Sequence, residues 1–254
     1  MSTDRSVTAK PAVLLMTRPR EASDRFVALL PDAVQSKLTV LHAPLLQINP
    51  KPVAIDLTDC QGVIFTSANG VTAAGPPPGK LPAYCVGRRT TAVAQAAGWL
   101  AQFCGATAEA LVAQLSQKQP KSPLLHLHGE YTRGEIATRL CTVGLKCSGK
   151  TIYEQQLLPL DPSIRDGVGA QNIVIVPLFS PRLARHFASL VASMELDMEN
   201  FILIALSDAV ADELKDLNCK DLQVSKAPDA DAMAKMVRDA ADGLAHLEGG
   251  RPAQ

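Results

Sequence analysis

The sequence predicts an α/β protein in which two doubly wound parallel sheets are joined by a two-stranded linker, with a cleft between the two domains. Short apolar runs alternate with helical patterns along the chain, which is typical of parallel sheets covered by helices. A strand-turn-helix unit occurs twice, at residues 61–71 and 173–184. Two extended segments, 38–48 and 146–160, each lead into proline-rich sequence and indicate crossovers between the domains.

The elements follow in order from hydrophobic periodicity. Residues 12–16 form an apolar strand, and residues 20–30 form a helix with Phe26, Leu29 and Leu30 on one face. After the first crossover, the pattern predicts strands at 62–65, 83–86, 100–103 and 123–128, and helices from about 68 and at 90–97, 107–117 and 134–143. After the second, it predicts strands at 173–176, 201–206 and 222–224, and helices at 181–193, 209–217 and 230–244.

This order implies one discontinuous domain, residues 1–38 plus 161–254, and one inserted domain, residues 43–152. Both have the flavodoxin-like alternation of strand and helix. The 47% hydrophobic content is sufficient for two buried cores. The scarcity of aromatic residues favours parallel sheets over sandwiches or barrels.

Charge and cysteine usage exclude several classes of protein. The 25 basic and 25 acidic residues cancel and form no basic block, which argues against a nucleic-acid partner. No apolar run approaches the roughly 18 residues of a membrane span, and the polar N-terminus has no signal core, so we expect a cytoplasmic protein. The six cysteines are scattered without a CxxC pair, which favours reduced thiols over disulfides or a metal site.

Hydroxyl side chains follow the predicted strands. Ser67 and Ser180 each stand between a buried strand and a helix, at the strand ends where α/β proteins bind ligands. Thr90 and Ser207 form a second such pair, one strand-helix step later. Serine at this place often only caps a helix. The helix N-terminus also suits a carboxylate or phosphate, so capping and binding both remain open.

Arginines gather at the same kind of turn. An isolated arginine is usually a solvated charge, but several at strand-to-helix turns of a neutral chain indicate a local positive field for carboxylates. Both interpretations stay open for Arg18, Arg88, Arg89, Arg133 and Arg182.

Tyr153 lies on the second crossover, where its phenol would either pack as an amphipathic side chain or donate a proton to a leaving hydroxyl. His126 and His128 share one face of a strand. They predict a packed pair, since no pattern supplies the further ligands that a metal needs. The sequence has no G-x-G-x-x-G, no G-x-S-x-G, and no phosphate loop at 75–80, so nucleotide cofactors and serine hydrolysis lack support.

Five motifs in this order resemble those of the uroporphyrinogen-III synthase family and cover nearly the whole chain. They are Leu15–Pro19, Ile64–Val71, Val86–Thr90, Leu127–Gly129 with Arg133, and Thr151–Tyr153. The resemblance implies a monomer without metal or organic cofactor, whose substrate is hydroxymethylbilane, a linear tetrapyrrole with eight carboxylates. It further implies handover of this substrate from hydroxymethylbilane synthase.

The implied reaction begins with loss of the terminal hydroxyl, which gives an azafulvene. Attack by ring D then forms a spiro intermediate, which recloses to uroporphyrinogen III with ring D inverted. The resemblance makes Tyr153 the catalytic residue. It assigns substrate contacts to Arg18, Ser67, Ala68, Gly87, Arg88, Thr90, Gly129, Arg133, Ser180, Arg182 and Ser207. Ser207 and Val210 depart from the glycine and threonine common in the family, so a non-enzymatic binder of tetrapyrroles or other small anions stays as the alternative.

Overall fold

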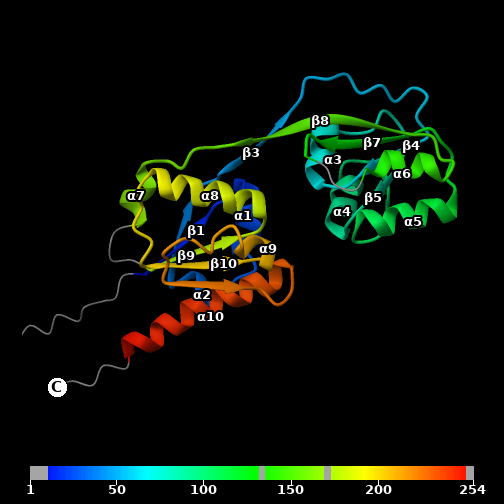
Figure 1. The fold of residues 1–254 in the computed structure, drawn as a ribbon. Helices are drawn as coiled ribbons and strands as arrows, with labels where there is room; N and C mark the ends of the chain where they lie inside the picture. The colour runs from blue at the N-terminus through cyan, green and yellow to red at the C-terminus, as the bar shows by residue number, and fades with distance from the viewer. Residues whose placement is uncertain (1–10, 132–134, 169–172, 250–254) are drawn as a thin grey trace, which may run out of the picture. The chain divides into compact units, whose positions relative to one another are not determined.

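Two β-sheets organise the computed structural model, which describes residues 11–131, 135–168 and 173–249 (Figure 1). The chain divides into two compact units. Unit 1 comprises Met1–Gln47 and Leu157–Gln254, and unit 2 comprises Ile48–Gln156. Both divisions fall inside the segments that the sequence predicts as crossovers. The α/β class with parallel sheets is confirmed.

Unit 1 contains a five-stranded sheet in the order β11-β10-β9-β1-β2, and every neighbouring pair is parallel. Its strands are β1 (Ala12–Met16), β2 (Leu38–His42), β9 (Val174–Leu178), β10 (Phe201–Ala205) and β11 (Asp221–Val224). Its helices are α1 (Arg20–Val27), α2 (Asp32–Gln35), α7 (Ser163–Val168), α8 (Pro181–Ser193), α9 (Asp208–Ala211) and α10 (Ala230–Gly249). This is the flavodoxin-like strand order, and its topological switch point lies between β1 and β9.

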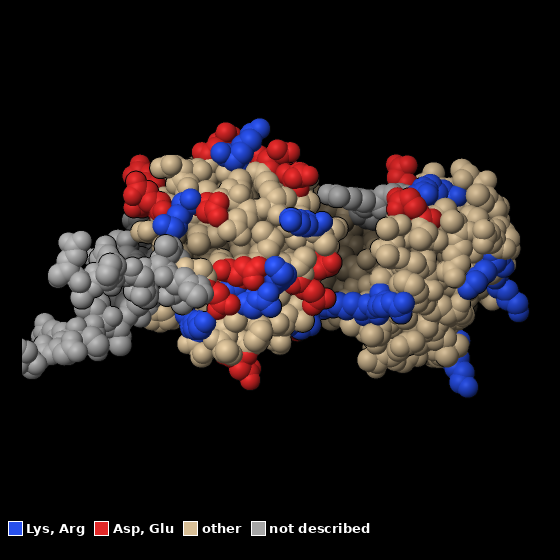
Figure 2. All heavy atoms as spheres, turned by 90° about the horizontal axis from the view of Figure 1, so that it is seen from below, with Lys and Arg blue, Asp and Glu red and all other residues tan. Residues whose placement is uncertain are grey.

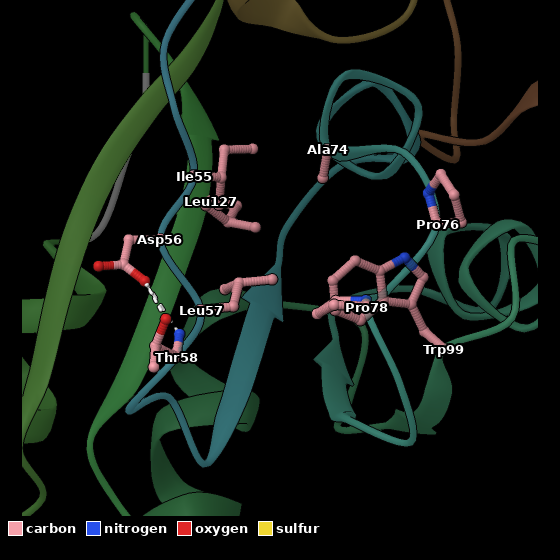
Figure 3. Close-up of a pocket in the computed structure, with 9 residues that line it drawn as sticks. All are labelled: Ile55, Asp56, Leu57, Thr58, Ala74, Pro76, Pro78, Trp99 and Leu127. Atoms are coloured by element: carbon pink, nitrogen blue, oxygen red, sulfur yellow. Dashed lines mark hydrogen bonds between the residues drawn. The ribbon is translucent and has the colours of Figure 1, made fainter.

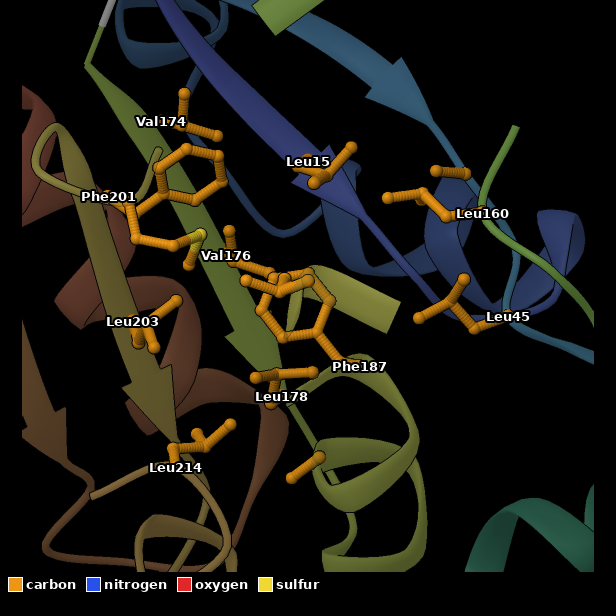
Figure 4. Close-up of a cluster of buried hydrophobic side chains, with 14 of the residues drawn as sticks. Leu15, Leu45, Leu160, Val174, Val176, Leu178, Phe187, Phe201, Leu203 and Leu214 are labelled. Atoms are coloured by element: carbon orange, nitrogen blue, oxygen red, sulfur yellow. The ribbon is translucent and has the colours of Figure 1, made fainter. Parts of the chain in front are cut away.

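Helices cover both faces of this sheet, which explains the continuous apolar runs of its strands. Val13 and Leu15 of β1 pack into a cluster with Phe187 of α8, while Leu14 and Met16 pack on the other face with residues of α1 and α10. Figure 4 shows the first cluster, in which the side chains of β1, β9 and β10 meet Phe187 and Leu214.

Unit 2 contains a six-stranded sheet in the order β3-β8-β7-β4-β5-β6. Its strands are β3 (Leu46–Pro50), β4 (Gly62–Phe65), β5 (Pro82–Cys85), β6 (Leu100–Phe103), β7 (Leu124–Gly129) and β8 (Cys147–Leu157). Its helices are α3 (Ala68–Ala74), α4 (Arg88–Ala96), α5 (Ala108–Lys118) and α6 (Ile136–Thr142). Val63 and Phe65 of β4 pack beneath α3 and α4, and Ile64 packs beneath α5 and α6. The switch point of this sheet lies between β4 and β7.

The structure divides the segment 38–48, which the sequence predicts as a single crossover. Leu38–His42 pairs with all five residues of β1 as an edge strand of unit 1, and only β3 continues as a linking strand beside β8. Pairing with β1 satisfies backbone groups on one side of the segment, which favours a sheet strand over a free crossing. The helix predicted at 209–217 is also shorter, because α9 ends at Ala211.

Among the helices of the described residues, none has both the length and the apolar character that crossing a bilayer requires. Acidic and basic side chains are interspersed over the part of unit 1 that is visible in Figure 2. This mixture agrees with the zero formal net charge of the chain.

Candidate active site

Three of the predicted site residues converge at the switch point of unit 2. Ser67 follows the end of β4, Gly129 ends the adjacent strand β7, and Tyr153 pairs with Gly129 from β8. The carboxyl ends of parallel strands at a switch point are the usual ligand site of a doubly wound sheet. The fold therefore brings the tyrosine singled out from the sequence to the place where this architecture binds ligands.

A β-bulge places the ring of Tyr153 against Gly129. His128 pairs with Thr151 but Gly129 pairs with Tyr153, so β8 contains one extra residue, Ile152. As a result Ile152 and Tyr153, although consecutive, both pack into the cluster that contains Val63 and Phe65. A Cβ atom on Gly129 would lie 2.5 Å from Cζ and 2.8 Å from Oη of the tyrosine, and a Cβ on Gly70 of α3 would lie 3.8 Å from its Cε1. The absence of a side chain at Gly129 thus makes room for the phenol, and Gly70 lies at ordinary contact distance from its other edge.

Among the residues that the structure describes, no backbone or side-chain group forms a hydrogen bond with Tyr153 Oη. Although the residue as a whole is only 4% exposed, Oη is not among the fully buried side-chain atoms that lack a partner, so the hydroxyl borders open space. The phenol therefore keeps its O–H available for a ligand.

Ser67 caps α3, as one of the two interpretations of the sequence requires. Its backbone is extended, and the N–H of Asn69 donates to Ser67 Oγ at 3.1 Å. Ala68 is the first residue of the helix and lies beside the carboxyl end of β4. The cap fixes the turn that carries both residues.

The next turn of unit 2 differs in detail from the prediction. Gly87 precedes α4 with φ of 81°, a conformation that favours glycine, and the helix begins at Arg88. Thr90 consequently lies in the first turn of α4, 6% exposed, and not at the strand end. The guanidinium of Arg88 stacks on the exposed ring of Phe103, with Cζ 5.1 Å from the ring centroid.

Thr90 and Ser207 are therefore not equivalent, although the sequence pairs them. Ser207 immediately precedes α9, as Gly87 precedes α4, and Val210 is the third residue of its helix, as Thr90 is. Unit 1 has an apolar side chain where unit 2 has the threonine.

Unit 1 brings Arg18 and Ser180 to its own switch point, between β1 and β9. The N–H of Leu183 donates to Ser180 Oγ at 3.3 Å, so this serine caps α8. Arg18 Cζ lies 4.2 Å from the centroid of the Phe179 ring. Arg182 is in the first turn of α8, and Arg133 lies outside the described residues. Sequence reasoning missed the stacking of Arg18 on Phe179, because these residues are far apart in the chain.

His126 and His128 form a packed pair behind Gly129. Their ring centroids are 4.7 Å apart, and His126 Nε2 lies 3.4 Å from Thr66 Oγ1. Burial, together with the neighbouring His128, lowers the pKa of His126 to about 4, so its imidazole is neutral near pH 7. Within the described part of the chain, no three histidine, cysteine or acidic residues are grouped closely enough to hold a metal ion.

A separate cavity of about 600 Å³ in unit 2 contains none of the predicted site residues (Figure 3). Its lining is largely apolar, and its one carboxylate, Asp56, accepts hydrogen bonds from Thr58 within the same loop. It is lined by Ile55, Asp56, Leu57, Thr58, Ala74, Pro76, Pro78, Trp99 and Leu127. This composition does not suit a ligand rich in carboxylates.

The model of the family described as uroporphyrinogen-III synthase HemD matches residues 28–235. The chain belongs to the uroporphyrinogen-III synthase family. The family resemblance of the sequence motifs is thereby confirmed. No protein with a curated description matches the sequence significantly.

Solved structures of uroporphyrinogen-III synthases share the fold. The enzyme from Helicobacter pylori 26695 superposes with a TM-score of 0.61 at 17% identity, covering 90% of this chain and 99% of its own. A mutant of the enzyme from the extremely thermophilic bacterium Thermus thermophilus gives a TM-score of 0.48 at 14% identity, covering 91% and 99%. At 17% identity, the similarity to the Helicobacter pylori enzyme supports the fold class alone. The candidate site residues are argued from the geometry described above.

Proposed function

We propose that this chain converts hydroxymethylbilane to uroporphyrinogen III, with loss of water and inversion of ring D. The observation that carries the proposal is Tyr153, whose ring lies against Gly129 at the switch point of unit 2 with its hydroxyl unshared by the described residues. Membership of the uroporphyrinogen-III synthase family supports the same reaction.

Tyr153 has the chemistry for the first step. Its O–H donates to the terminal hydroxyl of the bilane, the C–O bond breaks, and the hydroxyl leaves as water. The remaining azafulvenium loses its pyrrole N–H proton, which restores the proton that the phenol gave up, and the resulting azafulvene is the electrophile that the substituted carbon of ring D attacks. The later steps are a positioning task, because the correct folded conformer of the bilane decides which ring carbon reacts.

The carboxylates of the substrate need several cationic and N–H donors. We assign this role to Arg18, Arg88, Arg133 and Arg182, with Ser67, Ala68, Gly87, Thr90, Gly129, Ser180 and Ser207 as the polar and backbone contacts. Two of these arginines place Cζ over a phenylalanine ring, Arg18 over Phe179 and Arg88 over Phe103. The planar fork of a guanidinium matches the two oxygens of a carboxylate, which suits Arg88 to bidentate contact with the substrate.

A non-enzymatic tetrapyrrole or small-anion binder of the same fold is the second candidate. It is favoured by Ser207 and Val210 of unit 1, which stand where a glycine and a threonine are common in the family. A working enzyme would further receive its substrate from hydroxymethylbilane synthase. We also expect a cytoplasmic monomer, and the six free cysteines are consistent with a reducing compartment.

The deciding experiment is a coupled assay. Hydroxymethylbilane is generated by its upstream synthase, this protein is added, and the oxidised products are separated into isomers I and III. The proposal requires that the amount of isomer III rises with the amount of protein added. A product that consists of isomer I alone would support the non-enzymatic binder.

Two matched substitutions test the role of Tyr153 in the same assay. Tyr153→Phe should lower turnover about 10-fold or more through loss of the proton donor. Tyr84→Phe is the control, because Tyr84 is the other buried tyrosine of unit 2 and packs on the opposite face of its sheet. If Tyr153→Phe retained as much turnover as the Tyr84→Phe control, Tyr153 would have no role in the mechanism.

A further inference from the structure

The geometry of β7 points to His128 as a positioning residue for Tyr153, and this inference rests on the proposed function. We propose that its Nδ1–H holds the carbonyl of Gly129 and thereby fixes the bulge that lays the phenol ring across Gly129. His128 itself does not touch the reacting atoms in this role.

The hydrogen bond fixes which nitrogen carries the proton. His128 Nδ1 lies 2.7 Å from Gly129 O, and a carbonyl oxygen only accepts, so Nδ1 must be the donor. In the neutral imidazole Nε2 is then the acceptor nitrogen. The bond is made at the point of the ladder where the pairing shifts, between His128 and Gly129.

The imidazole of His128 is held from two sides. On one side it contacts the ring of His126, which is 3% exposed and neutral near pH 7. On the other it rests over the bare backbone of Gly149 in β8, where a Cβ atom would lie 3.0 Å from Nε2. A ring fixed in this way keeps its Nδ1–H directed at one carbonyl, at little further cost in conformational entropy.

The bulge decides where Tyr153 points. Alternation along a regular strand would send Ile152 and Tyr153 to opposite faces, yet both pack into the one cluster that contains Val63 and Phe65, because the extra residue shifts the register. The N–H of Glu130 donates to Tyr153 O at 3.0 Å on the far side of the shift. His128 and Glu130 thus flank the distortion, one through a side chain and one through the backbone.

Two replacements of His128 separate its donor from its bulk. His128→Asn keeps an N–H donor close to the position of Nδ1, whereas His128→Gln places its amide near the position of Nε2. The readout is the ring resonance of Tyr153 in the full chain labelled with ¹³C-tyrosine, assigned by its loss in Tyr153→Phe. We expect this resonance to move in His128→Gln and to stay near its wild-type position in His128→Asn.

Turnover in the coupled assay should fall in the variants in which the Tyr153 resonance moves. We expect kcat for isomer III to fall about 10-fold in His128→Gln and less than about 3-fold in His128→Asn, with a smaller change in KM, because a displaced phenol affects the chemical step. An unmoved resonance in His128→Gln would overturn the positioning role. A moved resonance with unchanged turnover would instead contradict the catalytic role of Tyr153, so the two failures are distinguishable.

Gly149→Ala provides a second variant if His128→Gln does not fold. The added Cβ would press on His128 Nε2 and displace the imidazole without removing its donor. We expect the Tyr153 resonance to shift in this variant as well. A folded Gly149→Ala protein with the wild-type resonance would count against the proposal.

Discussion

Gly129→Ala tests the site directly, because its methyl group cannot coexist with the observed position of Tyr153. The new Cβ would lie 2.5 Å from Cζ and 2.8 Å from Oη of the tyrosine, and it also overlaps Cε2. Ordinary contact begins at about 3.4 Å, so the phenol must retreat by roughly 1 Å. The backbone of residue 129 tolerates alanine, since its φ lies outside the left-handed region.

This displacement should have two measurable effects. A misplacement of about 1 Å can cost about 100-fold in rate, so we expect kcat for isomer III to fall by that order in the coupled assay. Overpacking of a buried site costs about 1–3 kcal/mol, which should appear as a lower free energy of unfolding in urea. Gly79→Ala is the matched control in unit 2, because a Cβ there meets nothing within 4 Å.

A double-mutant cycle identifies the clashing partner. In a Tyr153→Ala background the ring is gone, so Gly129→Ala should lose most of its cost to the free energy of unfolding. The reasoning would be refuted if folded Gly129→Ala protein kept wild-type turnover. It would equally be refuted if the substitution cost the same stability with and without the tyrosine ring.

Three further predictions concern neighbouring groups. Ser67→Ala removes a helix cap and should cost about 1 kcal/mol in urea unfolding, with a smaller loss of turnover than Tyr153→Phe; equal losses would contradict a mainly structural serine. Folding lowers the pKa of His126 from 6.5 to about 4. Between pH 6.5 and about pH 4 the unfolded chain therefore binds this proton and the folded protein does not. The free energy of unfolding consequently falls as the pH drops through that window. The loss approaches about 3 kcal/mol, and His126→Gln should lack it when unfolding is compared at about pH 7 and about pH 4. Phe103→Leu removes the ring beneath Arg88 and should raise KM for the bilane several-fold with little change in kcat, whereas a lower kcat at unchanged KM would argue against a binding role.

The sequence predicts the buried strands well because burial on both faces leaves a continuous apolar run. The strand at 12–16 and the helix at 181–193 have the predicted bounds. The segment 38–48 shows the limit of this reasoning. An edge strand and a free crossing are both extended, and only pairing with a distant strand distinguishes them.

The sequence singles out candidate residues for the site, but it does not predict how they contact one another. Tyr153 and Gly129 can be singled out from the sequence, yet their contact depends on a one-residue bulge that no local pattern indicates. The sequence places Thr90 at a strand end because a hydroxyl is the usual start of a helix. The glycine at φ of 81° starts α4 two residues earlier and carries no capping side chain.

The two switch points share a scaffold but differ in chemistry. In unit 2, Gly129 admits a tyrosine whose hydroxyl is unshared by the residues that the structure describes. In unit 1, the corresponding strand ends carry Arg18 on Phe179, a group suited to holding a carboxylate. The altered residues Ser207 and Val210 belong to unit 1, and neither lies on the strands that form the tyrosine site. The departures from the family pattern therefore concern unit 1, whereas the contacts that hold the phenol of Tyr153 come from β7, β8 and α3 of unit 2.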